Sequence, residues 1–164
     1  MTGIVTAALL AALVAPPAPC TGPEYRQFDF WAGDWDTYDL ADTSKVVARN
    51  RVTPILGGCV LREAYEQNDG LVGESYSLWD AARGVWHQSW VTNRGALLLL
   101  EGRVERGRMV LTGAEKTADG AASLLRGISW AEGKDVRERA ERSSDGGKTW
   151  TTVFDLVFRP HRPT

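Results

Sequence analysis

From residue 28 onward the chain alternates apolar and polar residues with a period of two, which is the spacing of a β-strand with one buried face. Glycine, asparagine and aspartate gather in the short gaps between the alternating runs, for example at 68–70 and 145–147, and these residues favour tight turns. The pattern predicts strands at residues 35–40, 45–54, 59–67, 73–79, 85–92, 96–103, 108–114, 122–131, 135–143 and 150–159.

The short gaps predict that each strand pairs antiparallel with the next one along the chain. A meander of this length closes on itself, because an open sheet would leave two exposed edges. We therefore expect an all-β fold, an antiparallel up-and-down barrel of about ten strands with a short helical turn within residues 21–27. The expected organisation is a leader over 1–20, a single barrel domain over 21–160 and a disordered tail over 161–164.

The first twenty residues resemble a targeting segment. Residues 4–14 form an apolar run of the length of a signal sequence's hydrophobic region, and the run is too short for a transmembrane span. An exported protein, periplasmic or secreted, is expected. Cys20 offers lipid attachment as an alternative to release. Cys20 and Cys59 could form a disulfide in an oxidising compartment or remain two unpaired thiols, and the sequence favours neither.

Charge and composition narrow the range of partners. The net charge is −2, with both signs interspersed along the chain, so no basic stripe predicts a nucleic-acid partner. His87 and His161 stand apart from other metal-ligating residues, and neither a metal site nor a cofactor is expected. Seven Trp are many for this length, and each brings a large apolar ring with an N–H that needs a partner. Nothing in the pattern specifies an oligomeric state.

Four predicted strands place a single polar residue among apolar neighbours on one face. If these faces turn toward the barrel interior, the polar groups converge there and could orient a ligand between aromatic walls. Alternatively, they form an ion pair and an amide that only fix the packing, with Arg126 bonded to Glu63 or Glu138. The candidate ligand-binding residues are Glu63, Tyr65, Trp86, Gln88, Trp90, Arg126, Trp130 and Glu138.

Three functions are compatible with this arrangement. The first is a barrel that binds a small, mostly apolar or aromatic molecule and has no chemistry of its own. The second is an enzyme that uses the same cavity, with Glu63 as general acid or base and Arg126 stabilising negative charge. The third is a structural or interaction module whose interior is filled by its own indoles.

Two local motifs support the barrel. The sequence Gly33-Asp34-Trp35 resembles the Gly-x-Trp signature of lipocalins and other calycins, in which the Trp plugs one barrel end beneath an Arg of the last strand. The resemblance implies that role for Arg159, through a cation–π contact with Trp35. Residues 143–150 resemble the Asp-box hairpin of sialidase propellers, in which an Asp accepts backbone N–H groups and a Trp packs beneath the turn.

The whole pattern also resembles a bacterial family of small exported proteins of unknown function. The shared segments are Phe-Asp-Phe-Trp-x-Gly-Asp-Trp at 28–35, Gly-x-Ser at 73–75, Trp-x-Gln-x-Trp at 86–90 and Asp-Gly-Gly-Lys-Thr-Trp at 145–150. This chain departs from the family at Thr92-Asn93, where an Asp is expected. The resemblance implies a lipocalin-like barrel and no particular activity.

Overall fold

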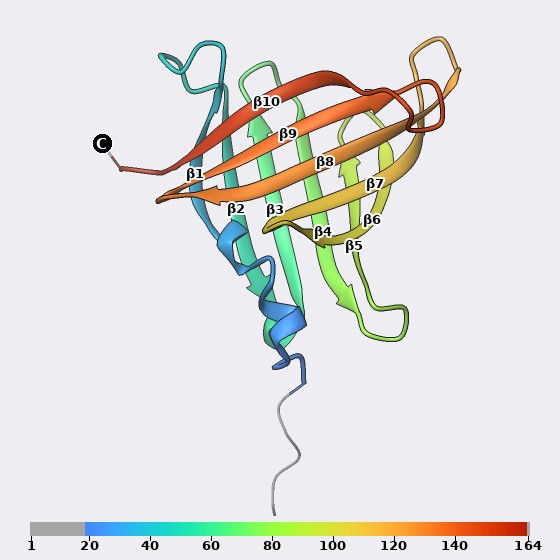
Figure 1. Cartoon of the computed structure of the whole chain (residues 1–164). Helices are drawn as coiled ribbons and strands as arrows, with labels where there is room; N and C mark the ends of the chain where they lie inside the picture. Colours follow the sequence, from blue (N-terminus) through green and yellow to red (C-terminus); the bar gives the residue numbers. More distant parts are fainter. Residues whose placement is uncertain (1–18, 164) are drawn as a thin grey trace, which may run out of the picture.

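The computed structural model describes residues 19–163, which form a closed antiparallel barrel of ten strands (Figure 1). Each strand pairs with its neighbours in the chain, and β1 pairs with β10 to close the ring, so the predicted fold class is confirmed. Most of the predicted leader lies outside the described residues. The strands are β1 Gly33–Asp39, β2 Ala48–Ile55, β3 Val60–Gln67, β4 Val72–Asp80, β5 Val85–Thr92, β6 Leu97–Glu105, β7 Arg108–Lys116, β8 Ala122–Glu132, β9 Asp135–Ser143 and β10 Thr151–Pro160.

The N-terminal segment closes one end of the barrel, which we call the floor (Figure 1). It contains two short 3-10 helices, η1 (Pro23–Arg26) and η2 (Asp29–Trp31), while a third, η3 (Leu56–Gly58), connects β2 to β3. The rings of Phe28 and Trp31 are only 2% and 3% exposed. Phe28 meets Trp86 edge-on at 5.6 Å between centroids, and Trp31 meets Phe158 in the same way at 4.6 Å. Edge-on aromatic pairs of this kind pack the floor.

The Gly-x-Trp motif has a steric explanation. A Cβ atom on Gly33 would lie 2.3 Å from the Trp35 ring, so only glycine lets the indole fold back over the start of β1. The Trp35 Nε1–H donates to the Trp31 carbonyl at 3.1 Å, which fixes the ring against the floor. Arg159 does not cover this ring as the resemblance implied. Its guanidinium lies 4.7 Å from the ring of Tyr38 on the outer face of β1, because alternation along β10 turns it away from the interior.

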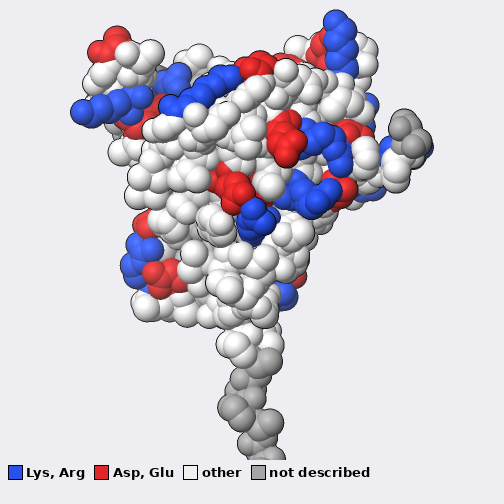
Figure 2. Space-filling model, turned by 180° about the vertical axis from the view of Figure 1, so that it is seen from behind, with Lys and Arg blue, Asp and Glu red and all other residues white. Residues whose placement is uncertain are grey.

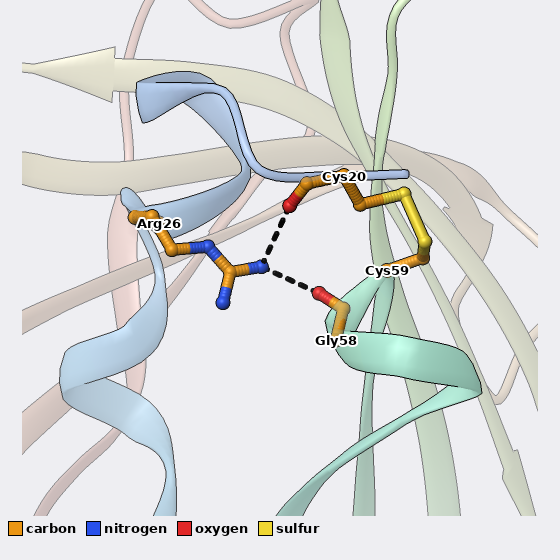
Figure 3. The surroundings of a disulfide bond; sticks show 4 residues. All are labelled: Cys20, Arg26, Gly58 and Cys59. Atoms are coloured by element: carbon orange, nitrogen blue, oxygen red, sulfur yellow. Dashed lines mark hydrogen bonds between the residues drawn. A yellow bond between two sulfur atoms is a disulfide. The ribbon is translucent and has the colours of Figure 1, made fainter. Parts of the chain in front are cut away.

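A disulfide joins Cys20 to Cys59 and attaches the N-terminal segment to the start of β3 (Figure 3). The sequence left open whether the two cysteines form a disulfide or remain unpaired thiols, and the structure shows the disulfide. The Arg26 guanidinium strengthens the same junction by donating to the carbonyls of Cys20 and Gly58. A cysteine held in a disulfide has no thiol to acylate, so this structure is incompatible with lipid attachment at Cys20.

The outer surface carries the Asp-box hairpin between β9 and β10, as expected. The Asp145 carboxylate accepts the Thr149 hydroxyl at 2.6 Å and the backbone N–H groups of Thr149 and Lys148 at 2.9 and 3.0 Å, and these hydrogen bonds lower its pKa. The Trp150 ring donates to the Gly147 carbonyl at 3.0 Å. On the face that Figure 2 shows, basic and acidic side chains lie side by side, with no patch of a single sign.

The chain stays on the barrel beyond β10. The backbone N–H of His161 donates to the Asp34 carbonyl at 2.8 Å, and its ring contacts the Asp36 carboxylate at 3.0 Å. These contacts hold His161 itself, and the disordered tail expected over 161–164 stays a prediction. Between residues 19 and 163, no helix has the length and apolar character needed to cross a membrane.

The end opposite the floor is ringed by five connections, which together we call the mouth: residues 40–47, 68–71, 93–96, 117–121 and 144–150. The first three are bonded to one another. Asn68 donates its side-chain N–H to the Val46 carbonyl at 2.7 Å, and Asn93 donates to the Gly70 carbonyl at 2.9 Å. The rim on this side is therefore held by side-chain amides as well as by the strands beneath it.

Candidate functional site

A cavity of about 490 Å³ occupies the barrel above the floor and reaches the mouth. Its position follows from its lining, which includes Asp39 and Gln67 at the mouth ends of β1 and β3 and Phe28 and Trp31 at the floor. Volumes of 300–1,000 Å³ are typical of small-molecule sites. Most of the lining is apolar, and its larger members include Trp90, Leu98, Leu100, Leu111, Phe154 and Phe158.

A chain of hydrogen bonds crosses four adjacent strands on one wall of the cavity and ends on a buried carboxyl. Gln88 on β5 donates to the Ser75 hydroxyl at 3.3 Å, and Ser75 on β4 donates to Glu63 Oε2 at 2.7 Å. Asn50 on β2 donates to Glu63 Oε1 at 2.9 Å. Burial raises the pKa of Glu63, and the two donors oppose that shift. Each Glu63 oxygen thus has a partner supplied by the barrel wall.

Glu138 on β9 is the second carboxyl of the cavity, and its environment is different. It lines the cavity, yet no described residue donates a hydrogen bond or an ion pair to it. Burial, reinforced by the nearby charge of Glu63, raises the pKa of Glu138 to about 8. At neutral pH the group is mostly protonated, so it has an acidic proton and two oxygens available to a molecule in the cavity.

An aromatic pair forms part of the wall beside these carboxyls. The rings of Tyr65 and Trp90 meet edge-on at 5.9 Å, and the Tyr65 hydroxyl donates to Gln67 Oε1 at 3.1 Å. A Cβ atom on Gly73 would lie 2.3 Å from the Trp90 ring, so this glycine makes room for the indole across the β4–β5 pair. Burial and the charges of Glu138 and Glu63 raise the pKa of Tyr65.

The structure places five predicted site residues on the cavity wall: Glu63, Tyr65, Gln88, Trp90 and Glu138. Trp86 points inward as expected, but it belongs to the floor, where its Nε1–H donates to Gln27 Oε1 at 3.1 Å. It therefore supports the cavity from below and does not form a wall, since the ring is only 2% exposed.

Arg126 and Trp130 lie outside the barrel, so their predicted place in the cavity is wrong. Arg126 pairs with Glu141 on the outer face of β9, and its guanidinium covers the Trp150 ring at 3.9 Å. The Trp130 ring has the guanidinium of Arg108 at 4.4 Å and that of Arg137 at 5.4 Å. These cation–π contacts cover the outward indoles, which removes the usual reason for a large apolar ring to face inward.

The inward face of β8 carries a glycine and a serine beside a single leucine instead. Leu125, Gly127 and Ser129 line the cavity, and a Cβ atom added to Gly127 would meet nothing within 4 Å. The barrel interior beside β8 is therefore left open, because Gly127 and Ser129 do not fill it. The buried ion pair that the packing alternative required between Arg126 and Glu63 or Glu138 is absent from the interior, and the two residues of the enzyme alternative lie on opposite sides of the wall.

Sequence reasoning missed several lining residues. Leu98 and Leu100 belong to a run of four leucines at 97–100, in which both faces of β6 look alike. Phe154 follows a bulge between Thr152 and Phe154 in the β9–β10 pairing, which shifts the alternation by one residue. Gly127 and Ser129 of β8 were the signal for open space, because small residues facing a barrel interior leave room for a ligand.

The unpaired Glu138 makes stability depend on pH in a defined direction. Because its pKa is higher in the folded chain than in the unfolded one, the folded state binds more protons between about pH 4.5 and 8. The stability associated with this group is therefore complete below pH 4.5 and is lost as the pH rises toward 8. At pH 8 we expect Glu138→Gln to unfold at a higher temperature than the parent chain. Its free energy of unfolding should be greater by an amount on the order of a few kcal/mol.

The measurement is thermal unfolding of both chains from pH 5 to pH 9. The difference between them should widen with pH and level off near pH 8. The control is Glu66→Gln, which removes an exposed carboxylate from the same barrel and should not change the pH dependence. A constant difference between the Glu138→Gln variant and the parent across this range would contradict the environment described for Glu138.

A scan against models of protein families found no match to this chain, and a search of curated proteins found none either. Within residues 19–163, no three His, Cys, Asp or Glu side chains come together as the ligands of a metal ion would. The geometry of the cavity is therefore the basis for a functional proposal.

Proposed function

We propose that this barrel binds a small, mostly apolar molecule in the cavity above its floor. The observation that carries the proposal is the open volume of about 490 Å³, bounded by aromatic and aliphatic side chains and continuous with the mouth. Only a few polar groups interrupt this lining, chiefly Glu63, Gln88 and Glu138. Apolar walls with a small number of placed polar groups are the usual composition of a binding site for a small molecule.

Two features favour binding over the alternatives. An interior filled by its own indoles would leave no such volume, and here the indoles of Trp31, Trp35 and Trp86 fill only the floor. A reaction would need a second group beside Glu63 to stabilise developing charge, and Arg126 is on the far side of the wall. Retention of a ligand without chemistry is the function that the site supports best.

We further infer that the protein acts outside the cytoplasm. Disulfides form and persist in oxidising compartments, and the link between Cys20 and Cys59 closes the floor on which the cavity rests. The apolar run at residues 4–14, with the length of a signal sequence's hydrophobic region, supports the same inference. Export remains to be tested by fractionation of cells that produce the full chain.

The proposal is tested by blocking the cavity from within. Gly127→Trp would place an indole in the space that the glycine leaves open, and Gly127→Leu is a smaller step of the same kind. We expect the parent chain to bind phenylnaphthylamine, a neutral apolar dye, with a saturable rise in dye emission and quenching of Trp emission. The leucine variant should bind the dye more weakly, and the tryptophan variant at least about tenfold more weakly, since a filled pocket excludes its ligand.

The control is Val91→Phe, which adds an aromatic ring to the exposed outer face of β5 next to Trp90. It should bind the dye as the parent chain does. Circular dichroism of each variant checks that the barrel has formed. Saturable binding that survives Gly127→Trp in a folded barrel would place the dye elsewhere, and no saturable binding to the parent chain would overturn the proposal.

A further inference from the structure

The charges of the cavity lining have one sign. Three carboxyl groups lie on it, Asp39 near the mouth and Glu63 and Glu138 deeper inside, and none of the lining residues is a lysine, arginine or histidine. Arg137 and Arg139, which flank Glu138 on β9, are turned outward, where they pair with Asp155. Arg142, nearer the mouth on the inward side of β9, is paired with Glu115. When these carboxyls of the lining are ionised, a molecule in the cavity experiences a negative potential that no basic group of the lining offsets.

The two deep carboxyls differ in the hydrogen bonds that they receive. Glu63 receives two hydrogen bonds from Asn50 and Ser75 and is held in one position by them. Glu138 receives none from the described residues, although it lies among apolar neighbours such as Leu156, its partner in the β9–β10 register. A carboxyl without a partner in such a place is costly, and an apolar side chain would cost less. In its ionised form Glu138 would be stabilised by a hydrogen-bond donor or a positive charge.

Aromatic rings surround the same space. The faces and edges of Tyr65, Trp90 and Phe154 border the cavity between the mouth and Glu138. Rings of this kind accommodate an apolar body and also attract a cation through their electron-rich faces. A cation with hydrophobic substituents would satisfy the ionised carboxyl and the rings together, whereas an anion such as a fatty-acid carboxylate would be repelled by Glu138 once the pH exceeds the pKa of about 8.

We propose that the cavity selects an apolar cation, an amine or quaternary ammonium with a hydrophobic body, whose positive charge is received by Glu138 with Glu63 beside it. This inference rests on the proposed function, because it specifies the class of molecule that the same cavity binds. The hydrophobic body lies against the aromatic rings and the leucines of the wall, and the charged end lies deepest. Asp39 at the mouth attracts the cation from solvent.

Binding of a cation is coupled to loss of a proton from Glu138, and the groups that face this carboxyl determine the coupling. They are Glu63 and Tyr65 on β3, while the opposite residues on β8 and β10, Ser129 and Leu156, do not titrate. The raised pKa of Tyr65 keeps its hydroxyl protonated over the working range. With the pKa of Glu138 at about 8, a probe of fixed charge should bind about tenfold more tightly at pH 9 than at pH 7.

The experiment compares benzyltrimethylammonium, whose charge does not change with pH, with neopentylbenzene, its neutral carbon isostere. Each is titrated against the dye-loaded parent chain, and displacement of the dye gives its affinity. We expect the cation to bind at least about tenfold more tightly than the isostere at pH 9, and this preference to shrink toward pH 6. Phenylacetate, an anion with a similar ring, should displace the dye least.

Glu138→Gln keeps the size of the side chain and removes its charge, so it should lose the preference for the cation and the pH dependence while binding the isostere as before. Glu66→Gln, with the same change of net charge on the outer face of β3, should behave as the parent chain does. Equal affinity of the cation and the isostere for the parent chain, or a preference that survives Glu138→Gln, would overturn the inference. Dye binding abolished by Gly127→Trp would still support the proposed function in either case.

Discussion

Removing the disulfide between Cys20 and Cys59 is expected to lower the free energy of unfolding by about 4 kcal/mol. The two cysteines are 39 residues apart, so the bond restricts a long loop in the unfolded chain. In the folded chain the bond holds the segment that brings Phe28 and Trp31 to the floor. The measurement is urea unfolding of the oxidised parent chain and of the double variant Cys20→Ser, Cys59→Ser.

The reduced parent chain is the natural control, since it has the same sequence without the bond. It should unfold at nearly the same urea concentration as the double variant. A loss smaller than about 1 kcal/mol in both would mean that the aromatic contacts of Phe28 and Trp31 hold the floor closed without the disulfide.

The second large effect is expected at a glycine in the barrel wall. Gly102→Ala should destabilise the chain by about 3 kcal/mol or more, although alanine is usually the better strand residue. A Cβ atom on Gly102 would lie 1.9 Å from the backbone carbonyl oxygen of Val110 on β7, where β6 and β7 approach closely. Backbone cannot move aside as a flexible side chain can, so the strands would have to separate.

Gly127→Ala is the matched control, because it makes the same chemical change on another strand of the same wall. Its Cβ atom meets nothing within 4 Å, and we expect a stability within about 0.5 kcal/mol of the parent chain or slightly above it. Urea unfolding of the two variants side by side measures the difference. Similar stabilities would show that the β6–β7 pair can relax around an added methyl group.

The period of two was sufficient to predict the fold, because every connection between strands is short and no other element competes for the chain. The same period correctly placed Glu63, Gln88 and Glu138 on the inner face, since each has large apolar neighbours that the interior needs. The predicted strand ends differ by a few residues from those found, as at β2, which begins at Ala48 and not at 45.

The pattern failed on β8, and the reason is physical. The rule that large apolar residues face inward assumes that the interior is full and the exterior is water. Here the interior keeps a cavity, so its β8 lining is Leu125, Gly127 and Ser129, while outside the arginines and the Asp-box hairpin cover the apolar side chains. The alternation of a single strand indicates neither the cavity inside nor the arginines that cover the outward indoles.

Two other features needed the folded chain. The pairing of Cys20 with Cys59 depends on where the N-terminal segment returns to the barrel, which no local pattern specifies. The division of the indoles between floor and wall depends on how deep each lies along the barrel axis. Trp86 and Trp90 share one face of β5, four residues apart, yet one supports the cavity and the other borders it.

The disulfide between Cys20 and Cys59 and the opening of the cavity lie at opposite ends of the barrel. The disulfide and the packed rings secure the pole where the chain enters the sheet, while access to the interior lies at the other pole, among hairpins joined by Asn68 and Asn93. The contacts that stabilise the fold and those that border the opening of the cavity are therefore at different ends of the barrel. If the barrel binds a small molecule as proposed, changes in the rim hairpins would alter access to the cavity without touching the disulfide and the aromatic contacts of the floor.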